Sequence, residues 1–231
     1  MLQQLKEELQ KLATPQRAKV SASFFKTGKG QYSEGDIFIG VTVPDTRKIA
    51  RKYLNIPFPD ITALLESKIH EHRLIALLLL VERFKKADQK TKTDIYNFYL
   101  KHTKYVNNWD LVDLSANYII GSYLFDKDKA LLYQLAKSHN LWERRIAIIA
   151  TFDFIRKNQF EDTFKLAELL LKDNHDLMHK AVGWMLREVG KKDQKALEVF
   201  LKKHAKQMPR TMLRYAIERF NKEKKKYYMQ K

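Results

Sequence analysis

Cysteine is absent from the sequence, and glycine and proline are scarce, with 7 and 5 residues among 231. Without cysteine the chain can form neither a disulfide nor a thiolate metal site. The few glycines and prolines argue against an all-β chain rich in tight turns and against a disordered chain. The longest apolar run, LIALLLLV at 74–81, is far too short to span a bilayer.

Acidic residues are too few to balance the basic ones. Lys and Arg number 44 and Asp and Glu 27, which gives a net charge of +17. Such a charge attracts polyanions, of which nucleic acid is the commonest in a cell. The alternative to a nucleic-acid-binding protein is one that is merely basic. Because the N-terminal amphipathic pattern at 1–13 lacks the apolar segment of a signal peptide, we expect a cytoplasmic protein that associates with the nucleoid through DNA.

Apolar residues recur at spacings of three and four along nearly the whole chain, which predicts an all-α fold. One interruption, at 28–44, holds four of the seven glycines, and Pro44 then favours the start of a helix. We expect a single domain over 1–231, with a frayed basic tail at 221–231.

Four stretches repeat a basic residue followed by a small, apolar helix. They are HRLIALLLLVERF from 72, RRIAIIATFDFI from 144, HKAVGWMLREVG from 179 and PRTMLRYAIERF from 209. NNWDLVDLSANYII from 107 fits between the first two and places Asp113 where the others place Arg73, Arg145, Lys180 and Arg210. The pattern predicts an α-solenoid of HEAT-like antiparallel helix pairs, a curved superhelix with a basic concave face along which these five positions form a stripe.

The stretch from 107 is unusual because its polar face carries a tryptophan. Asn108 is expected to cap a helix whose hidden face is Leu111, Leu114 and Tyr118. Trp109 and Asp113 lie four residues apart on the opposite face. Core packing for Trp109 and a structural ion pair for Asp113 are the alternatives to a functional site.

Two further residues extend this face in the expected stripe. Arg145 occupies the matching position one repeat later, and Trp184 follows Lys180 by one helical turn. At these residues the chain resembles the AlkD-type DNA alkylation repair glycosylases. The matching stretches are GDIFIGVTVPDTRKIA, NNWDLVDLSA, NLWERRIAII and HKAVGWMLREVGK, and they cover essentially the whole chain.

The resemblance implies a catalytic set made of Trp109, Asp113, Arg145 and Trp184. It implies a monofunctional DNA glycosylase that removes positively charged N3- or N7-alkylated purines, such as 3-methyladenine and 7-methylguanine, from duplex DNA. An abasic site would remain, and the enzyme would contact sugar and backbone instead of flipping the base into a pocket. We expect a monomer that needs no cofactor and binds no membrane.

Basic side chains along the concave face would neutralise phosphates. The candidates are Arg73, Lys180, Arg187, Arg210, Arg214 and Lys29. The loop KTGKGQ at 26–31 could also place backbone N–H groups on a phosphate. Two other function classes remain open, namely a non-catalytic solenoid that binds distorted or branched DNA and a protein-interaction scaffold.

No metal site is expected. The histidines of HEH at 70–72 diverge on a helix because they are two residues apart, and His175 and His179 lack a third ligand at suitable spacing.

Overall fold

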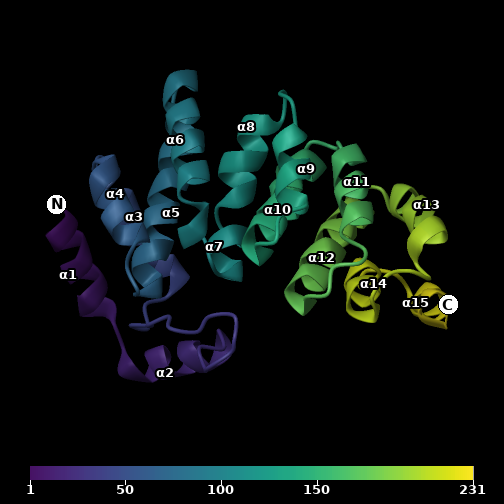
Figure 1. Ribbon diagram of the computed structural model, residues 1–231, viewed down its shortest axis with the longest axis horizontal. Coiled ribbons are helices and arrows are strands. Elements are labelled where there is room, and N and C mark those ends of the chain that lie inside the picture. Colours follow the sequence, from purple (N-terminus) through teal and green to yellow (C-terminus); the bar gives the residue numbers. More distant parts are fainter. Residues whose placement is uncertain (231) are drawn as a thin grey trace. The chain divides into compact units, whose positions relative to one another are not determined.

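The computed structural model describes residues 1–230, and these are predominantly helical (Figure 1). Within this range the one β-type contact is an isolated bridge between Ile37 and Ile69. The predicted all-α fold is therefore confirmed, and the helical packing is consistent with a solenoid. The chain forms two compact units, Met1–Ser115 and Ala116–Lys231. A curved superhelix and a basic concave face stay predictions, as does the single domain.

The first unit contains a series of helices joined by short connections and one long loop. Its elements are α1 (Leu2–Leu12), α2 (Pro15–Phe24), α3 (Val43–Lys52), α4 (Phe58–Leu65), α5 (His70–Lys86), α6 (Gln89–Lys101), η1 (Thr103–Tyr105) and α7 (Trp109–Asp113). The predicted helix start at Pro44 is confirmed, since this residue lies in the first turn of α3.

The second unit likewise consists of helices of different lengths. Its elements are the π-helix η2 (Asn117–Gly121), α8 (Ser122–Leu124), α9 (Ala130–Ala136), α10 (Leu141–Arg156), α11 (Glu161–Leu169), α12 (Asp176–Lys192), α13 (Gln194–His204), α14 (Arg210–Ala216) and α15 (Lys222–Gln230). No helix within residues 1–230 combines the length and the apolar character needed to cross a membrane.

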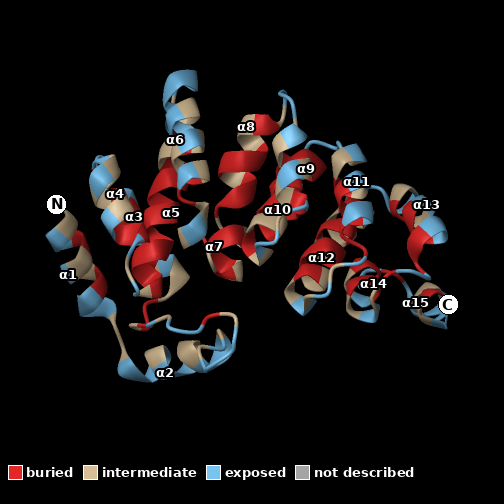
Figure 2. Cartoon of the chain, in the orientation of Figure 1, coloured by how far each residue is buried: buried red, intermediate tan, exposed pale blue. Residues whose placement is uncertain are grey.

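The core of each unit forms around long central helices. In the first unit α5 packs against α3, α4, α6 and α7, and it is buried along almost all of its length (Figure 2). In the second unit α10 packs against α9, α11 and α12, and α12 packs against α14. A helix surrounded on several sides is apolar around its circumference, which explains the run LIALLLLV in α5.

The loop at 25–42 is held against the beginning of α5. The buried carboxylate of Glu71 accepts hydrogen bonds from the backbone N–H groups of Ile39, Gly40 and Val41, the shortest at 2.8 Å. Gly40 has φ +83° and runs so close to α2 that a Cβ atom would contact the backbone of Thr14 and Ala18. This glycine therefore serves both a left-handed turn and a close approach.

Helix α2 differs from the other α-helices of the first unit because it buries none of its residues (Figure 2). Val20 and Phe24 are 65% and 64% exposed. Helix α2 is attached to the rest of the unit through its two ends. Thr14 bonds to the backbone at 39–40, and Phe25 packs in an aromatic cluster.

The same turn precedes three of the central helices. Its position shows that the predicted register of the repeats is shifted. In each turn the first side chain accepts the N–H two residues later, and a basic side chain six residues later donates to the first residue's carbonyl. The pairs are Ser67 with Arg73, Ser138 with Arg144, and Asp173 with His179. The predicted alignment of Arg73 with Arg145 and Lys180 was therefore wrong by one residue, because hydrogen bonds of the turn set the register and the apolar pattern does not record them.

The predicted helix through 108–120 is interrupted. Helix α7 ends at Asp113, and a π-helix begins at Asn117. Ser115 donates to the Leu111 carbonyl, a back-bond that bends helices. Leu111 is buried as expected, but Leu114 and Tyr118 are only half-buried, because the bend removes the continuous face on which they were placed.

The predicted frayed tail at 221–231 was also wrong for its described part. Residues Lys222–Gln230 form α15, whose first turn is capped by Asn221 through the N–H of Lys224. Tyr228 is 3% exposed and its ring packs on Phe220. Two aromatic residues anchor a segment whose basic composition alone indicates a solvated end. Lys231 lies outside the described residues.

Candidate functional site

Helix α7 presents Trp109 at its first position. The side chain of Asn108 accepts the N–H of Trp109 at 2.8 Å, which confirms the predicted cap. The indole ring stacks on Phe25 with centroids 5.0 Å apart and an interplanar angle of 11°, and the ring of Phe24 meets it edge-on at 5.9 Å. Trp109 is half-buried. The ring is thus held in an aromatic cluster at the surface of the first unit and is not deep in its core.

Two aspartates on α7 have different environments. Asp110 is 5% exposed, and its two oxygens accept the Leu111 N–H at 2.8 Å and contact His70 Nε2 at 2.7 Å. Asp113, one turn after Trp109, is half-buried. Burial raises the pKa of the Tyr99 hydroxyl, its hydrogen bond with Ser115 lowers it, and the negative charge of Asp113 raises it further. Asp113 therefore acts electrostatically on the interior of the unit while remaining partly open.

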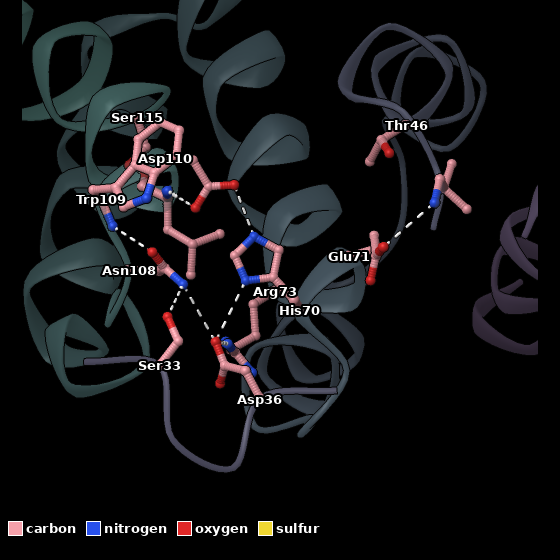
Figure 3. A network of polar contacts seen from close by, with 12 residues as sticks. Ser33, Asp36, Thr46, His70, Glu71, Arg73, Asn108, Trp109, Asp110 and Ser115 are labelled. Carbon is pink, nitrogen blue, oxygen red and sulfur yellow. Dashed lines mark hydrogen bonds and ion pairs between the residues drawn. The ribbon is translucent and has the colours of Figure 1, made fainter. Parts of the chain in front are cut away.

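A buried polar network holds the first turn of α7 (Figure 3). The Asn108 amide donates to Ser33 Oγ at 2.6 Å and lies 3.4 Å from Asp36 Oδ2. Asp36 also pairs with Arg73 Nη2 at 2.7 Å. The network joins α7, α5 and the 25–42 loop, so the position of Trp109 depends on all three.

Arg145 belongs to the second unit and is buried. It is 5% exposed, and its Nη1 donates to the carbonyl of Leu177 across the packed pair α10 and α12. Its neighbour Arg144 instead pairs with Asp173, at 2.6 Å between Nε and Oδ2. The two arginines of WERR thus make different contacts. Arg144 stabilises the turn before α10, and Arg145 bonds to the beginning of α12.

Trp184 also lies in the second unit, on α12. Its indole N–H donates to Glu188 Oε1 at 3.0 Å, and its ring packs on Phe152 at 5.7 Å. The Arg156 guanidinium lies 4.2 Å from the centroid of the Phe152 ring. Trp184 is half-buried, so this second tryptophan resembles Trp109 in being supported by a phenylalanine and partly open.

The structure removes Arg73 from the candidate phosphate contacts. Arg73 is 3% exposed, and its guanidinium is taken up by Asp36 and by the Ser67 carbonyl at 2.9 Å. A buried and paired guanidinium is not available to DNA. The prediction was wrong because the sequence shows a basic residue at a repeat position but not the acid at 36 that neutralises it.

The other phosphate candidates lie at or near the surface. Lys180 is half-buried and pairs with Asp176 at 2.7 Å, and Arg187 pairs with Glu218. Lys29, Arg210 and Arg214 are exposed. These three offer the most accessible positive charges among the candidates.

The loop at 26–31 is less open to phosphate than predicted. The N–H of Gly28 donates to Gln31 Oε1 at 3.0 Å, and that of Gly30 donates to Glu34 Oε2 at 2.7 Å. Side chains of the same loop satisfy the backbone donors that a phosphate would need. We therefore retain Lys29 as a candidate and not the backbone of the loop.

Several residues of this region escaped sequence reasoning. Phe25, Asp36 and His70 surround the first turn of α7, to which Asp110 belongs, yet they come from the 25–42 loop and from α5. From the sequence alone, HEH at 70–72 indicates at most a metal motif. The two histidines do diverge, with His70 facing Asp110 and His72 facing Ser67. Within residues 1–230 no group of three or more His, Asp or Glu is arranged to hold a metal.

Comparison with known proteins relates most of the chain to one family. The DNA alkylation repair enzyme family matches residues 5–220. Among solved structures, a predicted DNA alkylation repair enzyme from Enterococcus faecalis has a TM-score of 0.70 and 17% sequence identity, covering 91% of this chain and 97% of that one. At this identity the likeness shows the fold alone. Comparison with the curated proteins finds no match.

The family match covers the loop at 25–42, α7, α10 and α12, and so includes every residue of the expected catalytic set. The chain belongs to the DNA alkylation repair enzyme family.

Proposed function

We propose that this protein is a monofunctional DNA glycosylase. It hydrolyses the N-glycosidic bond of positively charged N3- or N7-alkylated purines in duplex DNA, such as 3-methyladenine and 7-methylguanine, and leaves an abasic site. Membership of the DNA alkylation repair enzyme family supports a repair reaction on DNA. The glycosylase chemistry, the substrates and the catalytic residues are proposed from the residues of α7, α10 and α12.

The contrast between the two aspartates of α7 carries this proposal. Asp110 is buried and bonded to His70, whereas Asp113 is half-buried and lies one helical turn from the half-buried Trp109. An aspartate with a purely structural role is expected to be as buried as Asp110. A carboxylate that is partly open beside an aromatic ring suits a charged ligand.

The chemistry needs a carboxylate more than it needs a general acid. Alkylation at N3 or N7 gives the base a positive charge, so it leaves readily as a neutral purine. The sugar then passes through an oxocarbenium-like state, which a nearby negative charge stabilises. We assign this role to Asp113, which would also orient the attacking water or take up its proton.

The tryptophans would favour the same charged sugar. The face of an indole ring attracts cations through its quadrupole. Stacking on Phe25 fixes the plane of Trp109, and contact with Phe152 restrains Trp184. Such rings can lie against a deoxyribose without a pocket that encloses the base, so we expect the enzyme to contact sugar and backbone.

Arg145 completes the proposed catalytic set. Its guanidinium is buried and bonded to the Leu177 carbonyl, so we include it on the resemblance to the family and not on its exposure, as a planar donor that suits a carboxylate or a phosphate. The exposed Arg210, Arg214 and Lys29 would supply sequence-independent binding to the DNA backbone. The proposed partner is therefore double-stranded DNA, bound by a monomer without a cofactor.

The decisive experiment measures release of 3-methyladenine and 7-methylguanine from methylated duplex DNA by the wild type and by Asp113→Asn. We expect the variant to lose at least about 100-fold in single-turnover rate, the usual range for loss of an electrostatic catalytic group. Asp94→Asn serves as a matched control, because Asp94 is an exposed aspartate of α6 and its loss changes the net charge by the same amount. This control should retain full activity.

The outcome separates the function classes. Release by the wild type and by Asp94→Asn, but not by Asp113→Asn, supports the glycosylase. Binding of duplex DNA without release of either base by the wild type would favour a non-catalytic binding solenoid. Absence of both release and DNA binding at low salt would favour a protein-interaction scaffold.

A further inference from the structure

A histidine is buried between two carboxylates behind the first turn of α7 (Figure 3). His70, at the start of α5, is 2% exposed. Its Nε2 lies 2.7 Å from Asp110 Oδ2 on α7, and its Nδ1 lies 3.5 Å from Asp36 Oδ2 on the 25–42 loop. One imidazole ring thus joins three elements that meet beside Trp109.

This histidine is held in its charged form. Burial alone lowers the pKa of His70, but the charge and hydrogen bond of Asp110 and the contact with Asp36 outweigh it and raise the pKa to about 9. The charged groups that face the ring are Asp110 from α7, Asp36 from the loop and Arg73 on α5 itself, the last of which lowers the pKa. Burial raises the pKa of the Asp36 carboxyl, but His70 and Arg73 together lower it below its usual value.

An aromatic chain connects His70 to the indole of Trp109. The imidazole stacks on Phe38 with centroids 4.5 Å apart, and it lies 5.1 Å from the ring of Phe25. Phe25 in turn stacks on Trp109 at 5.0 Å and 11°. A displacement of the imidazole would therefore be transmitted through one ring to the tryptophan.

Hydrogen bonds connect the same network to the backbone of Trp109. The residue before it, Asn108, donates to Ser33 and lies beside Asp36, and the residue after it, Asp110, is the partner of His70. Both neighbours of the tryptophan are thus tied to the acids that share the imidazolium. Asp110 would not remain buried at low cost if that positive charge were removed, whereas Asp36 would keep its pair with Arg73.

We propose that His70 is a positioning residue, an imidazolium that Asp36 and Asp110 share and that fixes both the backbone and the ring plane of Trp109 for contact with the substrate sugar. This inference rests on the proposed function, because it takes Trp109 as the ring that meets the sugar. It adds that the orientation of this ring is controlled by a buried charge.

The test combines catalysis with a direct observation of the ring. His70→Gln removes the charge and keeps a hydrogen-bond donor. His72→Gln is the matched control, since His72 is also buried on α5 but faces Ser67 and not α7. Phe25→Leu is a second variant, which removes the stacking on Trp109 while leaving the acids and the histidine in place.

We expect His70→Gln and Phe25→Leu to slow single-turnover base release by about tenfold or more, because small misplacements of a reacting group have large effects on rate. Affinity for undamaged duplex DNA should change by less than about twofold, since no phosphate contact is lost. His72→Gln should release bases at the wild-type rate. Equal rates for His70→Gln, Phe25→Leu and the wild type would overturn the proposal.

Fluorine NMR of protein labelled with 5-fluorotryptophan follows the ring without any substrate. The chain has 3 tryptophans, and the resonance lost in Trp109→Phe identifies Trp109. Between pH 7 and pH 10 this resonance should shift with a midpoint near 9 in the wild type, where the pKa of His70 lies, and should stay constant in His70→Gln. The resonances of Trp142 and Trp184 should stay constant in both.

The two readouts separate this inference from the proposed function. If the wild type releases no base, the glycosylase proposal fails, and the titration of the Trp109 resonance still decides whether His70 positions the ring. A Trp109 resonance that does not respond to pH in the wild type, or that responds equally in His70→Gln, would overturn the role of His70 even in an active enzyme.

Discussion

Two histidines on α5, only two residues apart, differ in charge at neutral pH, one being a cation and the other neutral. His70 lies between two carboxylates and is stabilised as a cation, whereas His72 is 8% exposed and bonds to the neutral Ser67 hydroxyl. Burial lowers the pKa of His72 to about 4, and the positive charges of Lys6 and Arg73 act in the same direction. The same residue type on one helix thus responds to acid at one position and to alkali at the other.

The state of His72 predicts a loss of stability in mild acid. Its pKa of about 4 in the folded protein lies below the value of about 6.5 in an unfolded chain, so as the pH falls the unfolded state binds the proton first. The free energy of unfolding should therefore fall between pH 6.5 and pH 4, by at most about 1.4 kcal/mol per pH unit from this group. Urea denaturation of the wild type and His72→Gln at several pH values measures it. An identical pH dependence in the two proteins would contradict the assignment.

The sequence predicts single side chains well when the partner is a neighbour in the chain. The cap of α7 by Asn108 could be predicted because the side chain bonds to the next N–H. Phe25 against Trp109, and Asp36 against His70, could not, because their partners lie 84 and 34 residues away in sequence. The chemistry of Trp109 is readable from the sequence, but the residues that would hold its ring are not.

At the scale of elements, the contact between α12 and α14 depends on Gly183. A Cβ atom at this position would lie 2.5 Å from the Met212 carbonyl oxygen and 2.5 Å from Tyr215 Cβ. The first is a backbone atom of α14 and the second is bonded directly to that backbone, so neither can move without separating the helices. A glycine in the middle of a helix is normally unfavourable, and here it allows the close packing next to Trp184.

Gly183→Ala should therefore destabilise the protein, by about 1–3 kcal/mol, the range for overpacking in a core. Gly190→Ala on the same helix is the comparison, because its Cβ would meet the end of the Leu197 side chain and no backbone atom at so short a distance. This second variant should be destabilised less than Gly183→Ala, since a side-chain end can shift more easily than a helix and alanine has the better helix propensity. Urea midpoints of both variants provide the measurement, and a Gly183→Ala protein as stable as Gly190→Ala would show that the two helices adjust freely.

Most helices were predictable from the apolar period, and their interruptions were not. The period of three and four residues continues through 111–120, although the chain bends at Ser115 and enters a π-helix at Asn117. Likewise, the turns that begin at Ser67 and Ser138 set the repeat register through hydrogen bonds that leave no apolar signature. Element type follows from burial, whereas bends and registers follow from polar contacts.

At the scale of the whole molecule, the net charge of +17 is the property most relevant to the proposed partner. Some of the 44 basic side chains are paired with acids and so contribute nothing to this excess. Arg73 is buried with Asp36, and Lys165 on α11 pairs with Glu161 at 2.7 Å. Arg210 and Arg214 on α14 are exposed, so they contribute to the field that DNA would meet.

Binding to undamaged duplex DNA should weaken steeply with salt. Arg210→Gln and Arg214→Gln should each reduce the slope of log affinity against log salt by about 1 and weaken binding to all sequences. Lys165→Gln removes the same charge from a paired position and should leave the slope unchanged. Fluorescence anisotropy over a range of salt concentrations gives the slopes. An unchanged slope for either arginine variant would remove that residue from the DNA-binding surface.

Local stability differs from helix to helix within the first unit, and we expect α2 to open most easily. A helix with no buried residue has little to lose on opening, whereas α5 unfolds only with the core around it. Opening of α2 alone would carry Phe24 and Phe25 away from Trp109 and leave the buried helices folded. Loss of the support for the proposed catalytic ring therefore needs only a local opening of low free energy. Activity would be lost through this partial opening well before the protein as a whole denatures.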